Sequence, residues 1–333
     1  MIDILEGVNR EVKIGEHGLV FLVDCMPRVI KPEQTMDHAI LRAARTSYGN
    51  SEKEGTDAEN RGLIRYLVRN AHTTPVEFCV FQFYLALPIF VARQLIRHRM
   101  QSVNEYSLRY SEPKEQCYVP PVDDVRQQSK TNKQGSEGQV DSDLAQYFRE
   151  VTQETFDAAY KQYQGDTSNG IGREQARINL PLSTFTFWHF KMDLHNLLRT
   201  LSLRMDKHAQ KEIRDYANAI YEIVKPLAPW TIEAFNDFDM RRDAMLLTGP
   251  EVNFLRDAER WAQNLGCVDP LHLNTRVTMR EQEEFVVKLN RLGMTEQAGR
   301  LSDWIKSEKD RIKKEKDAAE AEEKKRLDAL KPF

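Results

Sequence analysis

The chain has 333 residues, of which 41% are hydrophobic and 9% aromatic, so it can bury a sizeable core and is not disordered throughout. Its 48 Lys and Arg residues and 51 Asp and Glu residues give a formal net charge of -3, which argues against a generally basic nucleic-acid coat. The length fits two domains, or one larger domain with an extension.

The first predicted element is a strand at Gly18–Met26, a β-rich apolar run that two prolines follow. The Ala- and Arg-rich segment 36–46 and the segment 59–70 are expected to form helices. Aromatic and β-branched residues are dense in the segment 78–87, which predicts a second strand. A proline then begins the segment 88–100, whose helical spacing predicts a helix.

The second half of the chain begins with a polar segment, 126–143, which has no aromatic residue and is expected to be a loop or insertion. A helix is predicted from residue 144 to about 163. Four leucines at helical spacing between Pro181 and Pro226 predict at least one long helix there. The final segment, 307–331, mixes nine Lys and Arg with eight Asp and Glu, which predicts a solvated helix or a disordered tail rather than a coiled coil.

Neither a membrane span nor a cysteine framework is indicated. The sequence has no apolar stretch of about 18 residues and no secretory signal at its start, so a cytoplasmic location is expected. Cys25, Cys79, Cys117 and Cys267 are scattered and form no C-x-x-C pair. Each is expected to be a small buried side chain, although a lone catalytic cysteine is an alternative.

The segment 92–112 is the richest in chemically functional side chains. Gln94 and Arg97 lie three residues apart, so a helix would place them on one partly buried face. Clustered cations near a core repel one another and lose hydration, which an anionic ligand would offset. Guanidinium groups match phosphate geometry and Ser107 adds a hydroxyl, so the segment predicts a phosphate-bearing ligand. The alternative is a surface helix with ordinary salt bridges to its own glutamates.

Two further clusters have helical spacing. Arg173 and Arg177 lie four residues apart, and the same spacing relates the pairs His195 with Arg199 and Arg204 with His208. No H-E-x-x-H motif occurs, so no metal site is predicted. The absence of a Walker A loop and of G-x-G-x-x-G gives no support to a Rossmann domain.

At this point the motifs resemble a known family. The triplet Arg-His-Arg at 97–99, followed after seven residues by Ser107, resembles the RHRx7S signature of flavin-dependent thymidylate synthases, the ThyX family. HTTPVEF, PIFVARQ, NEYSLRY, REQARINLPL and LRMDKHAQKEIRDYA also resemble that family in order and spacing, over roughly residues 15–240. The resemblance implies an α/β (α+β-like) fold, with a twisted, mainly antiparallel sheet flanked by long helices. It implies a catalytic domain at 1–240 and a charged, mainly helical extension at 241–333.

The resemblance also implies an activity. Family members convert dUMP to dTMP, with 5,10-methylenetetrahydrofolate as the one-carbon donor, NADPH as the reductant of FAD, and reduced FAD as the hydride source. They are typically homotetramers with active sites between subunits. No nucleic-acid or membrane partner is implied.

Individual residues follow by position. The resemblance assigns dUMP binding to Gln94, Arg97, Glu105, Ser107, Arg109, Arg177 and Arg204. It assigns FAD binding to His72, Thr74, Arg97, His98, Arg99, Glu105, Asp193, His195 and Arg199. Arg204 is implied as the catalytic residue, because an always-charged guanidinium can stabilise charge that develops on the pyrimidine. Asp193 and Arg199 depart from the residues that are common at these two positions in the family.

Two hypotheses from other classes remain beside the enzyme. A nucleic-acid-binding module would use the arginine-rich helix, with Tyr106 and Tyr110 stacking on bases. A scaffolding protein would use the charged tail, residues 241–333, to recruit partners. The first predicts salt-dependent oligonucleotide binding without flavin, and the second predicts that removal of the tail abolishes the function.

Overall fold

The structure is a computed structural model that describes residues 1–130, 135–238 and 293–329, together with positions 279, 283, 286, 289 and 290. The chain divides into two compact units, Met1–Arg242 and Asp243–Phe333. Each unit is described by itself.

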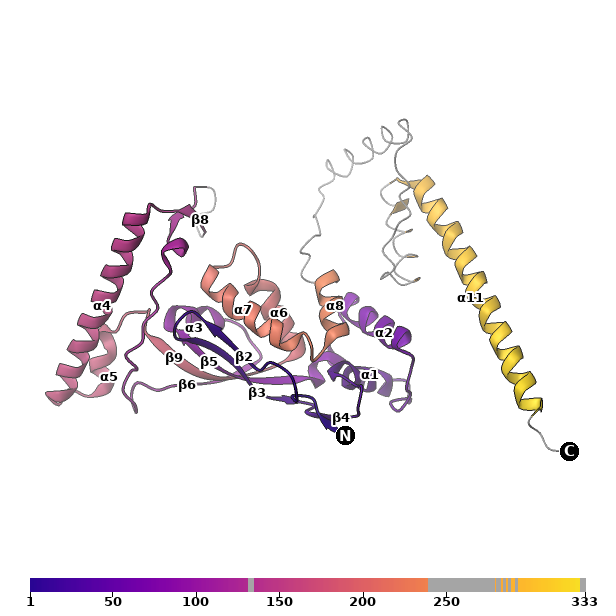
Figure 1. Cartoon of the computed structure of the whole chain (residues 1–333), viewed down its shortest axis with the longest axis horizontal. Helices are drawn as coiled ribbons and strands as arrows, with labels where there is room; N and C mark the ends of the chain where they lie inside the picture. The colour runs from indigo at the N-terminus through magenta and orange to yellow at the C-terminus, as the bar shows by residue number, and fades with distance from the viewer. Residues whose placement is uncertain are drawn as a thin grey trace. The chain divides into compact units, whose positions relative to one another are not determined.

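A five-stranded sheet forms the centre of the first unit (Figure 1). The strands lie in the order β2 (Glu11–Ile14), β3 (Gly18–Met26), β5 (Val80–Pro88), β9 (Phe185–Asp193) and β6 (Gln101–Glu105). Every neighbouring pair is antiparallel. The strand expected at Gly18–Met26 is confirmed, and β5 corresponds to the strand expected at 78–87. β9 was not predicted, because its apolar residues continue into a leucine-rich helix with no glycine or proline between them.

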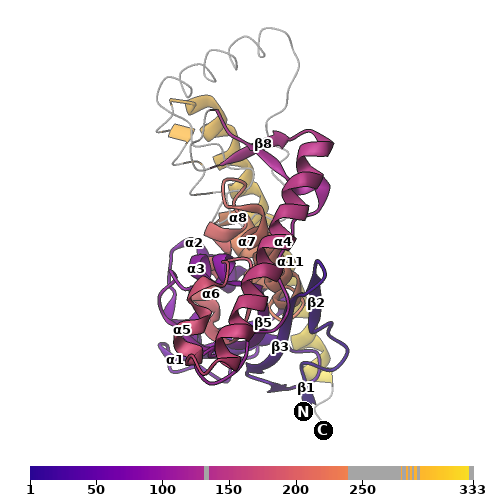
Figure 2. The same ribbon diagram turned by 90° about the vertical axis from the view of Figure 1, so that its left-hand side faces the viewer.

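Helices cover one face of this sheet. α3 (Ile89–Leu95), α6 (Leu194–Arg204) and α7 (Lys211–Val224) lie together on that face in both views (Figures 1 and 2). Successive side chains of a strand point to opposite faces. In β9, Trp188 and Phe190 are therefore buried under the helices, whereas His189 and Lys191 on the other face are exposed. The expected α/β (α+β-like) architecture of an antiparallel sheet with long helices is confirmed.

The other helices of this unit frame the sheet. They are α1 (Met36–Thr46), α2 (Asp57–Arg69), α4 (Ser142–Ser168), α5 (Arg173–Ala176) and α8 (Pro229–Phe238), with 3-10 turns η1 (Thr74–Phe78), η2 (Val122–Asp124) and η3 (Arg177–Asn179). The helices expected at 36–46, 59–70 and 144–163 correspond to α1, α2 and α4. At least one helix was expected between Pro181 and Pro226, and two occur there: α6, which contains the four leucines, and α7.

Asp37 joins the first and last helices of the sheet unit. Its carboxylate is fully buried at 0% exposure, and it accepts hydrogen bonds from the N–H groups of Trp230 and Thr231 at 2.8 and 3.1 Å. The Thr231 hydroxyl donates a third bond at 2.5 Å. These donors lie in the first turn of α8, where free N–H groups and the helix dipole favour a carboxylate. One residue of α1 therefore fixes the start of α8.

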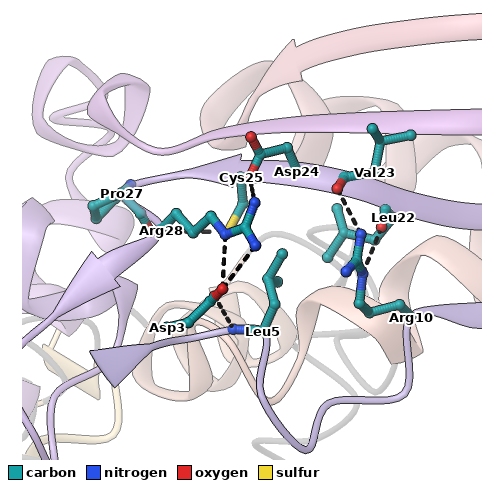
Figure 3. Close-up of polar contacts among 9 residues, drawn as sticks. All are labelled: Asp3, Leu5, Arg10, Leu22, Val23, Asp24, Cys25, Pro27 and Arg28. Carbon is teal, nitrogen blue, oxygen red and sulfur yellow. Dashed lines mark hydrogen bonds and ion pairs between the residues drawn. The ribbon is translucent and has the colours of Figure 1, made fainter. Parts of the chain in front are cut away.

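Two arginines fasten the N-terminal segment to the edge of β3 (Figure 3). Arg10 donates from Nε and Nη2 to the carbonyls of Leu22 and Val23, at 2.9 and 2.6 Å. The pairing of β3 with β5 shifts register at this point, and a β-bulge leaves backbone groups unpaired. Arg28 donates to Asp3 from Nε and Nη2, at 2.9 and 2.7 Å, and this contact lowers the pKa of the half-buried Asp3 carboxyl. The two guanidinium groups thus make residues 1–10 part of the fold.

Two small ribbons lie outside the main sheet. β1 (Ile2–Asp3) pairs with β4 (Val29–Ile30), and β7 (Arg126–Gln128) pairs with β8 (Ser136–Gln139). The expectation of a loop over 126–143 is therefore wrong for residues 126–128 and 136–139, which form an exposed antiparallel ribbon, and for residues 142–143, which begin α4. Backbone pairing of this kind needs no apolar pattern, so the polar sequence gave no signal for it. Residues 131–134 lie outside the described residues.

The second unit contains α11 (Thr295–Ala329). The helix expected within 307–331 is confirmed as far as residue 329. Its mixed charges pair along the helix, as where Arg311 contacts Glu308 and Glu315. Ala298 and Ile305 are buried with Leu289, whereas Ile312 is 47% exposed.

Candidate active site

The turn between α3 and β6 carries the Arg-His-Arg triplet at 97–99. Pro88 is the N-cap of α3, and the helix ends after Leu95. The backbone then turns through Met100, whose φ of 60° is left-handed, and β6 returns to pair with β9. The helix expected over 88–100 is therefore wrong beyond Leu95, and Arg97 shares no helical face with Gln94. The hypothesis of a nucleic-acid-binding arginine-rich helix loses its structural basis.

The two arginines of the triplet are exposed, so the expected partial burial is wrong for them, whereas His98 is half-buried. In the part of the chain that the structure describes, neither Arg97 nor Arg99 has a carboxylate partner. The alternative of salt bridges to Glu105 and Glu112 within the segment is wrong among the described residues. Glu105 accepts a hydrogen bond from Thr186 at 2.8 Å, and Glu112 pairs with Arg173 at 3.0 Å. Two exposed guanidinium groups without carboxylate partners suit an anionic ligand.

His98 lies beside Arg204, the last residue of α6. The Nε–H of Arg204 donates to Nε2 of His98 at 2.8 Å, and its Nη2 donates to the carbonyl of Gln94 at 2.9 Å. The Gln94 amide in turn donates to Oε1 of Gln210 at 2.6 Å. Burial, and then the charge of Arg204, lower the pKa of His98 to about 4, and burial also lowers the pKa of Arg204. This cluster joins α3, the triplet, α6 and the N-cap of α7.

A second group of expected site residues lies after β6. The hydroxyl of Ser107 accepts a hydrogen bond from the N–H of Arg109 at 3.3 Å, and Arg109 forms an ion pair with Glu174 of α5 at 3.0 Å. Arg177 begins η3, directly after α5. The contact between Arg109 and Glu174 therefore places this loop beside the second arginine cluster. Glu105, at the end of β6, leads into the same loop.

A third group lies at the start of α6. Asp193 ends β9 and is the N-cap of α6, where its carboxylate accepts hydrogen bonds from the N–H and the side-chain amide of Asn196, at 3.0 and 2.7 Å. His195 and Arg199 follow on α6 at the expected helical spacing. His72 and Thr74 lie at η1, which packs against α6. Asp193 thus has a structural role as an N-cap.

The three groups are divided between the two ends of the sheet. Gln101, which follows the triplet, lies opposite Met192, near the start of α6. Glu105 lies opposite Trp188, four residues farther along β6, which at about 3.3 Å per residue separates the ends by roughly 13 Å. The first and third groups therefore share one end, and Ser107, Arg109 and Arg177 gather at the other.

One expected helical pair is not formed. α6 ends at Arg204, so His208 lies in the following turn and contacts Asp206 at 2.8 Å. The two side chains share no helical face, because the turn needed to start α7 interrupts the helix.

The cysteines are not activated nucleophiles where the structure describes them. Cys25, Cys79 and Cys117 are free and buried. Burial raises the pKa of Cys25 to about 12 and that of Cys117 to about 11, and it also raises the pKa of Cys79. Because the thiolate is the reactive form, these three thiols are structural, as expected. Cys267 lies outside the described residues.

Three residues that bind the expected site residues were not predicted from the sequence. Gln210 binds the Gln94 amide, Thr186 binds Glu105 and Glu174 binds Arg109. Gln210 and Glu174 both lie inside motifs that resemble the family, which was a usable signal. Thr186 had none, because its contact depends on the register of the unpredicted strand β9.

Among the residues that the structure describes, no group of three or more His, Cys, Asp and Glu side chains could hold a metal ion. No helix in the described ranges is both long and apolar enough to span a membrane.

Comparison with known proteins connects this arrangement to a family. The family model of the thymidylate synthase complementing protein matches residues 28–230. A flavin-dependent thymidylate synthase of Dictyostelium discoideum is 43% identical over 287 residues, covering 86% of this chain and 89% of the relative. The enzyme of the same name from Gluconobacter oxydans is 40% identical over 281 residues, covering 84% and 87%.

A solved structure agrees with these relatives. The UMP/dUMP methylase PolB from Streptomyces cacaoi, in its structure bound with 5-Br dUMP, superposes with a TM-score of 0.61 at 32% identity. The match covers 69% of this chain and 99% of PolB. The motifs, the fold and these comparisons agree, and the chain belongs to the flavin-dependent thymidylate synthase family of enzymes.

Proposed function

We propose that the protein methylates dUMP reductively to dTMP, with 5,10-methylenetetrahydrofolate as the one-carbon donor and NADPH-reduced FAD as the hydride source. One observation carries this proposal beyond the family. Arg204 is a half-buried cation that, among the described residues, has neutral acceptors but no carboxylate partner. A cation in that state gains from an electron-rich ligand, because burial without a counter-charge costs free energy. A pyrimidine that becomes anionic during the reaction meets this need.

The dUMP site of the proposal uses residues from two groups. Arg204 is the catalytic residue, because its guanidinium stabilises negative charge on the pyrimidine. The phosphate and the rest of the nucleotide are held by Gln94, Arg97, Glu105, Ser107, Arg109 and Arg177. Arg109 is 57% exposed at its side chain and paired with an equally exposed Glu174, so it can exchange this partner for a phosphate at little cost.

Most of the proposed FAD site lies at the end of the sheet that the triplet shares with the start of α6. Its proposed residues at that end are His72, Thr74, Arg97, His98, Arg99, Asp193, His195 and Arg199. Glu105, the remaining proposed FAD residue, lies at the opposite end of β6, so a second copy of the chain would have to bring it close. The exposed guanidinium groups of Arg97 and Arg99 fit a pyrophosphate, which needs donors and positive charge. The carboxylate of Asp193 accepts two hydrogen bonds from Asn196, so it is held in the helix cap and points toward the start of α6. Bound FAD, once reduced, supplies the hydride.

We also propose a homotetramer with active sites between subunits. The dUMP residues of one chain lie at opposite ends of β6, and a second copy can bring the missing end close. Four apolar side chains, Leu144, Tyr147, Phe148 and Val151, form an exposed stripe on α4, with exposures from 39% to 63%. Their spacing of three, four and seven residues puts them on one helical face. A contiguous exposed apolar face of this kind marks a protein interface.

Replacing Phe148 with glutamate is expected to reduce the assembled mass at least two-fold. The carboxylate would be buried without a partner if a second copy covers the stripe. Size-exclusion chromatography with light scattering measures the result. Lys161→Glu, on an exposed position of α4 outside the stripe, is the matched control and should leave the mass unchanged. An unchanged mass in Phe148→Glu would contradict an interface at the stripe.

The proposed function is tested by the visible absorption spectrum of the purified chain. Bound FAD should absorb near its usual visible bands, and dUMP should change both that spectrum and the rate of NADPH oxidation. Chromatography of the nucleotides should show dTMP only when dUMP, methylenetetrahydrofolate and NADPH are all present. A protein that neither contains nor binds FAD would overturn the proposal.

The remaining proposals concern placement and organisation. Residues 1–240 are proposed to form the catalytic domain, and residues 241–333 a charged extension that contains the helix α11. The helical character expected for residues 241–278 falls outside the described residues. A cytoplasmic location agrees with three free cysteines among the described residues, because a reducing compartment keeps thiols unpaired.

A further inference from the structure

The edges of the Arg204 guanidinium are used unequally. Nε and Nη2 form one edge of the planar group, and this edge is occupied by Nε2 of His98 and the carbonyl of Gln94. The adjacent edge, made of Nη1 and the second N–H of Nη2, has no acceptor among the described residues. A guanidinium presents its five donors in a fixed fork, so filling one edge fixes the direction of the other.

The hydrogen bond from Arg204 also determines which nitrogen of the His98 ring carries the proton. Nε2 accepts a hydrogen bond, so it must carry a lone pair, and the ring proton must be on Nδ1. A doubly protonated ring would have no acceptor and would repel the guanidinium. Burial and the Arg204 charge keep the pKa of His98 near 4, so the ring is neutral at physiological pH. Nδ1–H remains as a donor on the far side of the ring.

We propose that His98 is a positioning residue, which holds Arg204 by its Nε/Nη2 edge and so directs the Nη1/Nη2 edge at the pyrimidine of dUMP. This inference rests on the proposed function and deepens it. The outer edge offers two parallel donors, and N3 and O2 of an ionised pyrimidine are two adjacent acceptors that match them. His98 therefore acts on dUMP through Arg204, while Nδ1–H is free to serve the neighbouring anion site.

Two substitutions separate the ring nitrogens. The side-chain oxygen of His98→Gln reaches about as far as Nε2 and can accept from Arg204. The shorter His98→Asn places its amide near the position of Nδ1 and leaves Arg204 without this acceptor. The dissociation constant for dUMP, measured by calorimetry, should rise about 10- to 100-fold in His98→Asn, the loss that accompanies a hydrogen bond to a charged group. In His98→Gln it should rise less than about 3-fold, within the range of near-neutral substitutions.

A double-mutant cycle distinguishes positioning from a general structural effect. If His98 acts through Arg204, His98→Asn should add no further loss of dUMP affinity in the Arg204→Ala background. 2-Deoxyribose 5-phosphate has no pyrimidine, so its affinity should be the same in all of these variants. His98→Ala enters the same cycle if His98→Asn lowers the melting temperature.

The outcomes separate the two proposals. Wild-type protein that binds no dUMP would overturn the proposed function, and this inference with it. Wild-type binding with equal losses in His98→Gln and His98→Asn would overturn only the role of His98. A loss of dUMP affinity in His98→Asn that adds to the loss in Arg204→Ala would also overturn only the role of His98. A loss of affinity for 2-deoxyribose 5-phosphate in the His98 variants would do the same.

Discussion

Arg204→Ala is expected to lower kcat for dTMP formation by about 100- to 1,000-fold, the loss typical of removing one preorganised donor from a developing charge. Arg204 is half-buried, and its Nε and Nη2 are held at 2.8 and 2.9 Å, so its position is fixed before the substrate arrives. Steady-state kinetics with saturating dUMP measures the effect. Arg204→Lys should recover only part of the loss, because an ammonium keeps the charge but not the fork.

The control for this prediction is Arg300→Ala. Arg300 lies on α11, outside the segment that the family model matches, and its ion pair among the described residues is with Glu296 of the same helix. Its removal should leave kcat unchanged within the error of the assay. Turnover of Arg204→Ala equal to that of Arg300→Ala would remove the catalytic role assigned to Arg204.

Asp37→Ala is expected to destabilise the folded chain by about 3 kcal/mol, because three buried donors in the first turn of α8 lose their acceptor. In a domain of this size such a loss lowers the melting temperature by about 6–12 °C. Calorimetry or circular dichroism measures it. Asp57→Ala, at an exposed site in the first turn of α2, is the matched control and should cost well under half as much.

The loss of stability caused by Asp37→Ala is also expected to depend on pH. Burial raises the pKa of Asp37 to about 6, above the ordinary value of 3.8, so the folded state holds this proton more tightly than the unfolded state does. The stability contributed by Asp37 is therefore complete below about pH 4 and falls as the pH rises through 6. The difference between wild type and Asp37→Ala should be larger at pH 5 than at pH 8. A difference that grows with pH would show that the folded state lowers the pKa of Asp37 instead of raising it.

Elements whose sequence signals lie within the element itself were predicted correctly. β3 and α1 were expected at the residues where they occur, because strand propensity, helical spacing and proline boundaries all agree there. β9 has an apolar pattern too, but it joins α6 without a breaking residue, so the strand was not recognised from the sequence. α3 ends early for a tertiary reason, since the chain must reverse at Met100 for β6 to reach β9.

The candidate site, too, could be predicted only as far as local motifs reach. Its residue types were recognisable from motifs, but the partner of Arg204 was not, because His98 is 106 positions away in the chain. The expected face shared by Arg204 and His208 followed from spacing alone, and the end of α6 removes it. Contacts between distant segments depend on strand register and helix ends, which a single sequence specifies only weakly.

Residues 1–10, which Arg10 and Arg28 fasten to the fold, lead into two strands of the central sheet, and this limits how far the chain can be shortened from its N-terminus. The family model begins at residue 28, after β2 and β3. A shortened polypeptide started there would lack two of the five strands of the central sheet. β5 would then become an open edge along its whole length, with unpaired N–H and C=O groups that can recruit a strand from any neighbour. Such a polypeptide would be prone to aggregate, although it would retain every residue assigned to catalysis.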